Sequence, residues 1–173
     1  MEKNVRDQNL ESTNGVCKAQ AGKYLTFMLA DEEYGLEILK VKEIIGMMDI
    51  TVLPQTPDFV KGVINLRGKV IPVIDLRLKF MMPEIGYSEK TCIIVVEIRH
   101  SVGTMQIGII VDQVSEVLNV TSEELEATPK FGVSLDTDFI LGMAKSGRKI
   151  ITLLDIGRVL VAEDILLISE NAA

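Results

Sequence analysis

The sequence predicts a mainly β protein made of two pseudo-symmetric halves, each a small five-stranded barrel with short helical turns. The first observation behind this prediction is a repeat, because Gly62–Leu76 recurs in degraded form eighty residues later as Gly142–Ile156. A second matched pair, Tyr34–Ile44 and Ile107–Val117, is offset by seventy-three residues, so the second copy carries about seven extra residues. Glycine and apolar positions that match in the same order indicate one unit used twice, and two copies are too few for a solenoid.

The first half opens with two strand patterns and a turn. Tyr24–Leu29 alternates in polarity, which predicts a half-buried strand, and Asp31–Glu33 is predicted to turn the chain into a second strand at Tyr34–Glu37. Brief helical spacing from Ile38 to Ile45 predicts a helical turn before a third strand near Glu43–Met47.

A hairpin follows in the first half, after two prolines that bias their neighbours toward turns. Residues 58–61 are predicted to make one helical turn. Gly62–Leu66 and Lys69–Ile74 are predicted to pair around a tip at Arg67–Gly68, where the glycine supplies the positive φ of a tight turn. Pro72 has no amide hydrogen, so it is expected at an edge or a bulge.

The second half repeats this plan. In both halves an aspartate, Asp75 or Asp155, ends a strand and precedes a short helical segment, which predicts that its carboxylate caps the helix start. The elements predicted here are the strands Cys92–Arg99, Met105–Val111, Glu116–Val120, Phe139–Ala144 and Arg148–Leu154, with helical segments at Leu76–Phe80 and Ile156–Leu160.

The domain boundaries follow from the same patterns. Residues 1–22 are polar and lack periodicity, which predicts a flexible tail. Residues 23–173 are expected to form a single domain, with barrel units at 23–82 and 90–160 between which strands could be exchanged. Residues 161–173 are predicted to hold a short C-terminal helix and a tail, because Glu163–Ser169 is amphipathic.

Composition limits the function. Apolar residues make up 47% of the chain, but no apolar run is long enough to span a membrane. This content indicates either exposed apolar surface patches or two dry barrel cores. A net charge of −7 argues against nucleic-acid binding, which needs a clustered basic face. Two separated cysteines and the lack of a signal pattern predict a reducing, cytoplasmic location.

The inventory of reactive side chains disfavours an enzyme. With a single histidine, His100, and two separated cysteines, no zinc tetrad and no histidine-based triad can assemble, so neither a metal nor a cofactor is predicted. No nucleophile elbow, phosphate loop or dinucleotide fingerprint is present. A hydrolase built on aspartates alone would require two carboxylates that converge in a pocket.

The hairpin tip differs between the two copies. Arg67–Gly68 in the first half becomes Gly147–Arg148 in the second, so the arginine changes place at the turn. A guanidinium on a rigid turn is suited to recognise a carboxylate of a partner, although an exposed turn also tolerates an arginine that has no role. Glu43 matches Glu116, so the repeat cannot separate a functional role from a structural one there.

Several segments together resemble the CheW family of chemotaxis coupling proteins, over the range from about Tyr24 to Ile168. The most specific block is Asn65–Gly68 with Val70–Arg77, which reads Asn-Leu-Arg-Gly followed by Val-Ile-Pro-Val-Ile-Asp-Leu-Arg. The resemblance implies two five-stranded SH3-like barrels and a non-enzymatic adaptor. Such an adaptor would bridge the cytoplasmic helical tip of a methyl-accepting chemoreceptor and the CheW-like regulatory domain of the histidine kinase CheA, in receptor arrays at the membrane.

The same resemblance implies partner-contact positions, without saying which face the receptor and which the kinase. They are Val41, Glu43, Gly62, Arg67 and Val117. The alternative from another class is a small-molecule-binding β-barrel sensor that uses the groove between the barrels. Nucleic-acid binding and direct membrane insertion are not expected.

Overall fold

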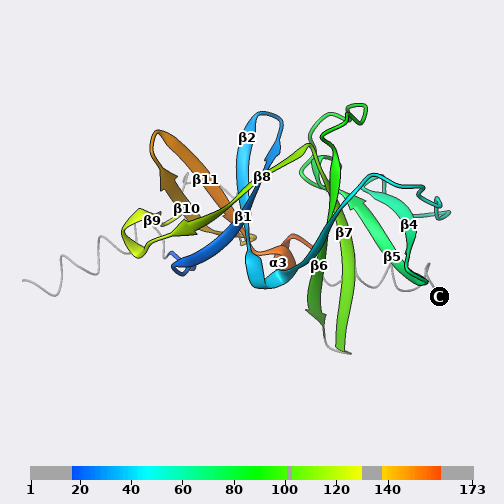
Figure 1. Ribbon diagram of the computed structural model, residues 1–173, viewed down its shortest axis with the longest axis horizontal. Helices are drawn as coiled ribbons and strands as arrows, with labels where there is room; N and C mark the ends of the chain where they lie inside the picture. The colour runs from blue at the N-terminus through cyan, green and yellow to red at the C-terminus, as the bar shows by residue number, and fades with distance from the viewer. Residues whose placement is uncertain (1–16, 101–102, 130–137, 161–173) are drawn as a thin grey trace, which may run out of the picture.

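The computed structural model describes residues 17–100, 103–129 and 138–160, which form two β-sheets and two short helices (Figure 1). The predicted mainly β fold is confirmed. The six-stranded sheet runs β8 (Gln113–Val120), β1 (Gly22–Leu29), β2 (Glu32–Glu37), β11 (Lys149–Leu154), β10 (Ile140–Ser146) and β9 (Leu125–Glu126). The five-stranded sheet runs β3 (Val41–Gly46), β6 (Cys92–His100), β7 (Gly103–Val111), β5 (Lys69–Asp75) and β4 (Val60–Leu66).

Each sheet draws strands from both halves of the sequence. The chain crosses from the six-stranded to the five-stranded sheet through a 3₁₀ turn at Ile38–Lys40, and it crosses back at Asp112. The repeat is visible in the two hairpins, because β4–β5 and β10–β11 show a register shift at equivalent places, before Gly62 and before Gly142. The sixth strand, β9, lies in the polar segment that lengthens the second copy.

Strand β1 differs from the half-buried strand that its alternation predicts. Leu25, Phe27 and Leu29 are buried as expected, but Tyr24 and Thr26 on the opposite face are only 2% and 1% exposed. The reason is that β1 lies between two cores. Its first face packs into a large cluster shared by both sheets, while Tyr24 packs inside the six-stranded sheet.

Local elements follow the predictions closely, with three corrections. The β1–β2 turn is centred one residue earlier than expected, at Ala30–Asp31, where both φ angles are positive (50° and 68°). Residues 58–61 form a hydrogen-bonded turn from Val60 N to Pro57 O, not a helix, because β4 already begins at Val60. Pro72 lies on an interior strand, where its missing amide is tolerated because the ladder to β7 begins one residue later.

Both predicted helix caps are confirmed. The Asp75 carboxylate accepts hydrogen bonds from the amides of Arg77 and Leu78 at the start of α2 (Leu76–Lys79). Asp155 accepts one from the Gly157 amide at the start of α3 (Ile156–Val159). The predicted C-terminal helix at 163–169 lies outside the described residues.

Three apolar clusters fill the molecule. Each sheet curves around one smaller cluster. The largest cluster lies between the two sheets, where side chains from β1 and β2 pack with those of β6 and β7. Both readings of the high apolar content therefore hold in part. The cores consist of buried apolar side chains, and several large apolar side chains also stay exposed, among them Leu39, Val52, Val70, Val117 and Ile150.

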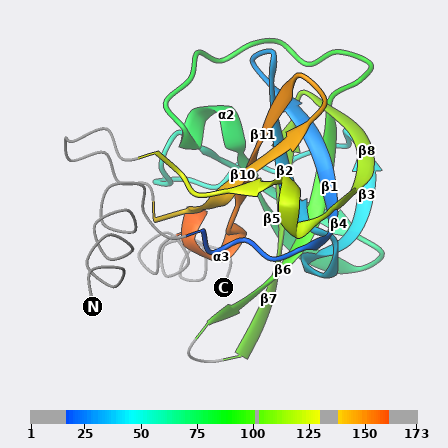
Figure 2. The same ribbon diagram turned by 90° about the vertical axis from the view of Figure 1, so that its left-hand side faces the viewer.

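The β6–β7 hairpin projects from the rest of the body (Figure 1, Figure 2). Strand β3 pairs with β6 only up to Val96, and β5 pairs with β7 only from Gly108. Beyond these points the two strands pair with each other alone. Of the predicted tail 1–22, residues 17–22 are described: the amides of Lys18 and Ala19 both donate to the carbonyl oxygen of Leu141 on β10, and Gly22 begins β1.

Candidate partner-binding surface

Glu43 and Arg67, two of the predicted contact residues, form an ion pair. Glu43 lies on β3 and Arg67 at the β4–β5 turn, and these strands are the two edges of the five-stranded sheet. The contact between them therefore helps to close the sheet into a barrel. The Arg67 side chain remains 73% exposed, so most of its guanidinium donors stay available to another molecule.

The turn that carries Arg67 has a defined conformation that is supported by a side-chain hydrogen bond. Arg67 and Gly68 have φ angles of 52° and 83°, which are the positive values that a two-residue hairpin turn requires. The side-chain oxygen of Asn65 accepts a hydrogen bond of 2.9 Å from the Gly68 amide and braces the loop. The arginine is thus presented from a fixed backbone, as its place at the tip predicts.

Gly62 serves the fold through its lack of a side chain. Its φ is 141°, and a Cβ at this position would lie 2.0 Å from the carbonyl oxygen of Thr51. Thr51 comes this close because it bridges to Val63 through two backbone hydrogen bonds of 2.8 and 2.9 Å. A substitution at Gly62 would therefore break the second point at which the five-stranded sheet closes.

The two predicted valines lie on different sheets. Val41 begins β3 and packs partly against the shared core, whereas Val117 lies on β8 and is 51% exposed. Val117 is matched by the repeat to Ile44 on β3, which is 45% exposed. The structure thus brings Glu43 and Arg67 into contact, keeps Val41 and Gly62 on the same sheet, and places Val117 on the other.

Exposed apolar residues near the Arg67 turn were missed by the sequence analysis. Val70 pairs with Asn65 across the hairpin and is 61% exposed, and Val52, next to the bridging Thr51, is 77% exposed. The alternation of β5 contains no such signal, because Pro72 and Ile74, on the same face as Val70, are buried along with Ile71 and Val73, and Val70 is exposed only because it lies near the hairpin tip.

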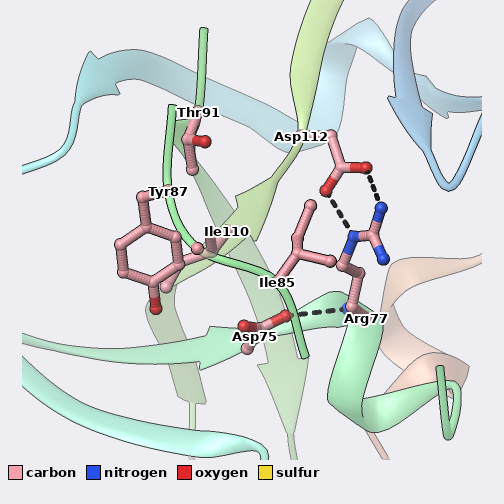
Figure 3. Close-up of a pocket in the computed structure, with 8 residues that line it drawn as sticks. Asp75, Arg77, Ile85, Tyr87, Thr91, Ile110 and Asp112 are labelled. Atoms are coloured by element: carbon pink, nitrogen blue, oxygen red, sulfur yellow. Dashed lines mark hydrogen bonds and ion pairs between the residues drawn. The ribbon is translucent and has the colours of Figure 1, made fainter. Parts of the chain in front are cut away.

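A small pocket lies beside α2, where Asp75, Arg77, Tyr87 and Asp112 approach one another (Figure 3). Its volume of about 10 Å³ is enough for one water molecule at most. The Asp75 carboxylate caps α2 through Oδ1, and both carboxylate oxygens of Asp112 are engaged by Arg77. This pocket offers no room for a metabolite.

The pKa values of the two carboxyl groups in this pocket are shifted in opposite directions. Burial raises the pKa of Asp75, and its hydrogen bonds to the helix amides only partly offset that effect. Burial also tends to raise the pKa of Asp112, but hydrogen bonds from Arg77 and from the Ala30 amide outweigh it, so the pKa lies below its ordinary value.

Neither a cluster of metal-binding side chains nor a membrane-spanning helix is found in the part of the chain that the structure describes. Within these residues, no three histidine, cysteine or acidic side chains gather as metal ligands would. Cys17 and Cys92 are not joined to each other, and burial raises the pKa of the Cys92 thiol. No described helix has the length and apolar character needed to cross a bilayer.

Comparison with known proteins gives one consistent family. The family model for the CheW-like domain matches residues 23–164. The chain is 42% identical to the chemotaxis protein CheW of Klebsiella aerogenes over 150 residues, which cover 87% of this chain and 88% of that protein. It is 35% identical to CheW of Bacillus subtilis over 142 residues, which cover 82% and 88%. The crystal structure of the scaffolding protein TtCheW from Thermoanaerobacter tengcongensis matches with a TM-score of 0.73 at 38% identity, over 84% of this chain and 96% of that one.

Proposed function

The chain belongs to the CheW-like domain family, and from that membership we propose that it is a non-enzymatic adaptor of bacterial chemotaxis. In this role it couples the cytoplasmic tips of methyl-accepting chemoreceptors to the histidine kinase CheA, so that receptors control kinase activity. The observation that carries the proposal is the match of the family model across residues 23–164. The protein acts in the cytoplasm at receptor arrays, and residues 23–173 form its functional domain, in which the units 23–82 and 90–160 exchange strands.

Five residues are proposed to contribute to contact with the receptor or the kinase. Arg67 and Val117 are exposed and suited to direct contact, while Glu43 holds Arg67 in place. Val41 and Gly62 support the same strands from within the fold. The proposal is supported by the exposed apolar side chains of Val70 and Val117, since the apolar face of a helix is a known partner for exposed apolar side chains.

A co-sedimentation experiment tests the adaptor role. Vesicles that carry a chemoreceptor cytoplasmic fragment are mixed with purified CheA, with and without this protein, and pelleted. We expect CheA to pellet, and its phosphorylation to respond to receptor signalling, only when the protein is present. A protein that pellets with neither partner, in the presence of a functional CheW as positive control, would contradict the proposal.

The pocket beside α2 does not support the alternative of a small-molecule sensor, because it holds at most one water molecule, and the larger hollows, such as the one of about 430 Å³ beside Met47 and Tyr87, are open surface depressions. A thermal-shift screen against metabolites separates the two functions, because a ligand that binds only the folded state raises the melting temperature by mass action. The adaptor predicts no such shift with metabolites and a clear one with the CheA regulatory domain.

A further inference from the structure

We propose that the ion pair between Arg77 and Asp112 sets the relative orientation of the two β-sheets and so positions the partner-contact surfaces that the sheets carry. Both are positioning residues, because they act through the arrangement of other residues. The statement about orientation is independent of the proposed function, whereas the statement about partner contact rests on it.

The pair lies where the two sheets are joined. Arg77 is on α2, which directly follows β5 of the five-stranded sheet, and Asp112 is the crossover residue between β7 and β8. Asp112 also holds the six-stranded sheet, because its carboxylate accepts a hydrogen bond of 2.9 Å from the Ala30 amide and its own amide donates to Met28 at 3.1 Å. One aspartate therefore connects the arginine of one sheet to the end of β1 in the other.

The contact has the geometry of a directional clamp. Arg77 Nε lies 2.7 Å from Asp112 Oδ1 and Nη2 lies 2.6 Å from Oδ2, so the two planar groups meet through parallel hydrogen bonds (Figure 3). The side chains are only 12% and 23% exposed. The guanidinium is fixed further by a hydrogen bond of 3.2 Å from Nη1 to the carbonyl oxygen of Pro83.

The shared apolar core holds the sheets together but specifies their angle less strictly. Burial of apolar surface is non-directional, and apolar cores tolerate repacking when volume is kept. A bidentate ion pair adds geometric specificity, because its two hydrogen bonds fix both distance and orientation. The apolar cluster therefore supplies cohesion between the sheets, while the Arg77–Asp112 pair selects one arrangement.

The repeat shows that the fold does not require this pair at both crossovers. Applying the two offsets of the repeat places Leu39 at the position of Asp112 and Gly157 at the position of Arg77. Leu39 lies at the other crossover and is 87% exposed. The same barrel unit thus folds with an uncharged crossover, which indicates that the charged one was selected for a property of the assembled pair of sheets.

Residual dipolar couplings of the weakly aligned full-length protein test the orientation directly. Amide couplings from the two sheets are fitted to separate alignment tensors, which coincide when the sheets move as one body. Three variants are compared. Arg77→Gln removes the charge, and Arg77→Lys keeps the charge but loses the two-pronged donor geometry of the guanidinium. Asp112→Asn keeps an oxygen that can accept from the Ala30 amide. The control is Lys145→Gln, which removes an ion pair with Glu126 within the six-stranded sheet.

We expect one shared tensor in the wild type and the control, and tensors that differ in direction or magnitude in all three clamp variants. Formation of the receptor–protein–CheA complex should weaken roughly fivefold or more, while affinity for each partner alone changes little. A single shared tensor in Arg77→Lys and Asp112→Asn would overturn the inference. These two milder variants are sufficient for the test if Arg77→Gln does not fold. Separate tensors with no effect on the ternary complex would overturn its functional part alone, and a wild type that binds neither partner would overturn the proposed function instead.

Discussion

Glu43 on β3 and Arg67 at the β4–β5 turn join the two edges of the five-stranded sheet through an ion pair. The same side chain that is expected to meet a partner is therefore engaged within the molecule. Because Arg67 is largely exposed, its ion pair contributes little to stability, about 0.2–1 kcal/mol for pairs of this kind. Its effect on binding can thus be separated from its effect on folding.

Reversal of charge at Arg67 should weaken binding while the protein stays folded. In Arg67→Glu, two carboxylates face each other, and the free energy of unfolding should fall by about 1 kcal/mol or less in urea titrations. Binding to the receptor fragment or to CheA should weaken about tenfold, as measured by titration calorimetry. The doubly reversed Glu43→Arg, Arg67→Glu variant should regain stability but not binding. Recovery of both would mean that the ion pair, and not the arginine, is what the partner needs.

Gly62 should be intolerant of any side chain for a structural reason. The Cβ of Gly62→Ala would meet the Thr51 carbonyl oxygen at 2.0 Å, so the bridge to Val63 must open. We expect a loss of more than about 2 kcal/mol in the free energy of unfolding, with weaker partner binding as a consequence. Gly46→Ala is the matched control, because a Cβ there meets nothing within 4 Å. A Gly62→Ala protein of normal stability that fails to bind would indicate direct contact instead.

The repeat allowed most of the strands and their order along the chain to be predicted from the sequence. It locates both hairpins and both helix caps, since glycine, aspartate and apolar positions recur in the same order. The repeat does not show which strands of one half pair with strands of the other. Matching positions identify equivalent residues in the two copies, not residues that contact each other. The exchange of β1 and β2 into a sheet with β8–β11 therefore emerges only from the structure.

The candidate site was predictable to a similar degree. Arg67 is conspicuous at a turn whose two copies differ, and its place at an exposed tip follows from local turn chemistry. Its partner Glu43 is 24 residues away in the chain and approaches only when the sheet closes. The Arg77–Asp112 pair is hidden for the same reason, since it depends on how the crossover meets α2.

Val117 should act as a contact residue of the six-stranded sheet. Val117→Asp places a charge at a 51% exposed strand position, so the free energy of unfolding should change by about 1 kcal/mol or less. Binding to one partner should weaken about tenfold or more, because a carboxylate would be desolvated in an apolar contact. Ile150→Asp, on β11 of the same sheet and 61% exposed, is the control and should bind normally. Equal losses in both variants would point to a general effect of charge on this sheet.

The acid stability of the protein should depend on Asp112. Its pKa in the folded state lies below the ordinary value, so the folded protein binds fewer protons than the unfolded chain as the pH falls. The stabilisation is complete above the unfolded pKa of about 3.9 and is lost as the pH falls through the folded pKa. Asp75 has a raised pKa and contributes with the opposite sign, so the comparison of wild type with Asp112→Asn is needed to isolate Asp112.

Urea unfolding between about pH 7 and pH 2 measures this linkage. At neutral pH the Asp112→Asn variant should be less stable than the wild type by about 1–3 kcal/mol, because a charged hydrogen bond to Arg77 is lost. The difference should begin to shrink at about pH 4, where Asp112 of the unfolded chain becomes protonated, and should shrink further as the pH falls through the lower pKa of the folded state. Asp49→Asn, in the exposed segment after β3, is the control for the loss of one surface charge. A difference that stays constant down to about pH 2 would show that the charge of Asp112 does not contribute to the stability of the junction between the sheets.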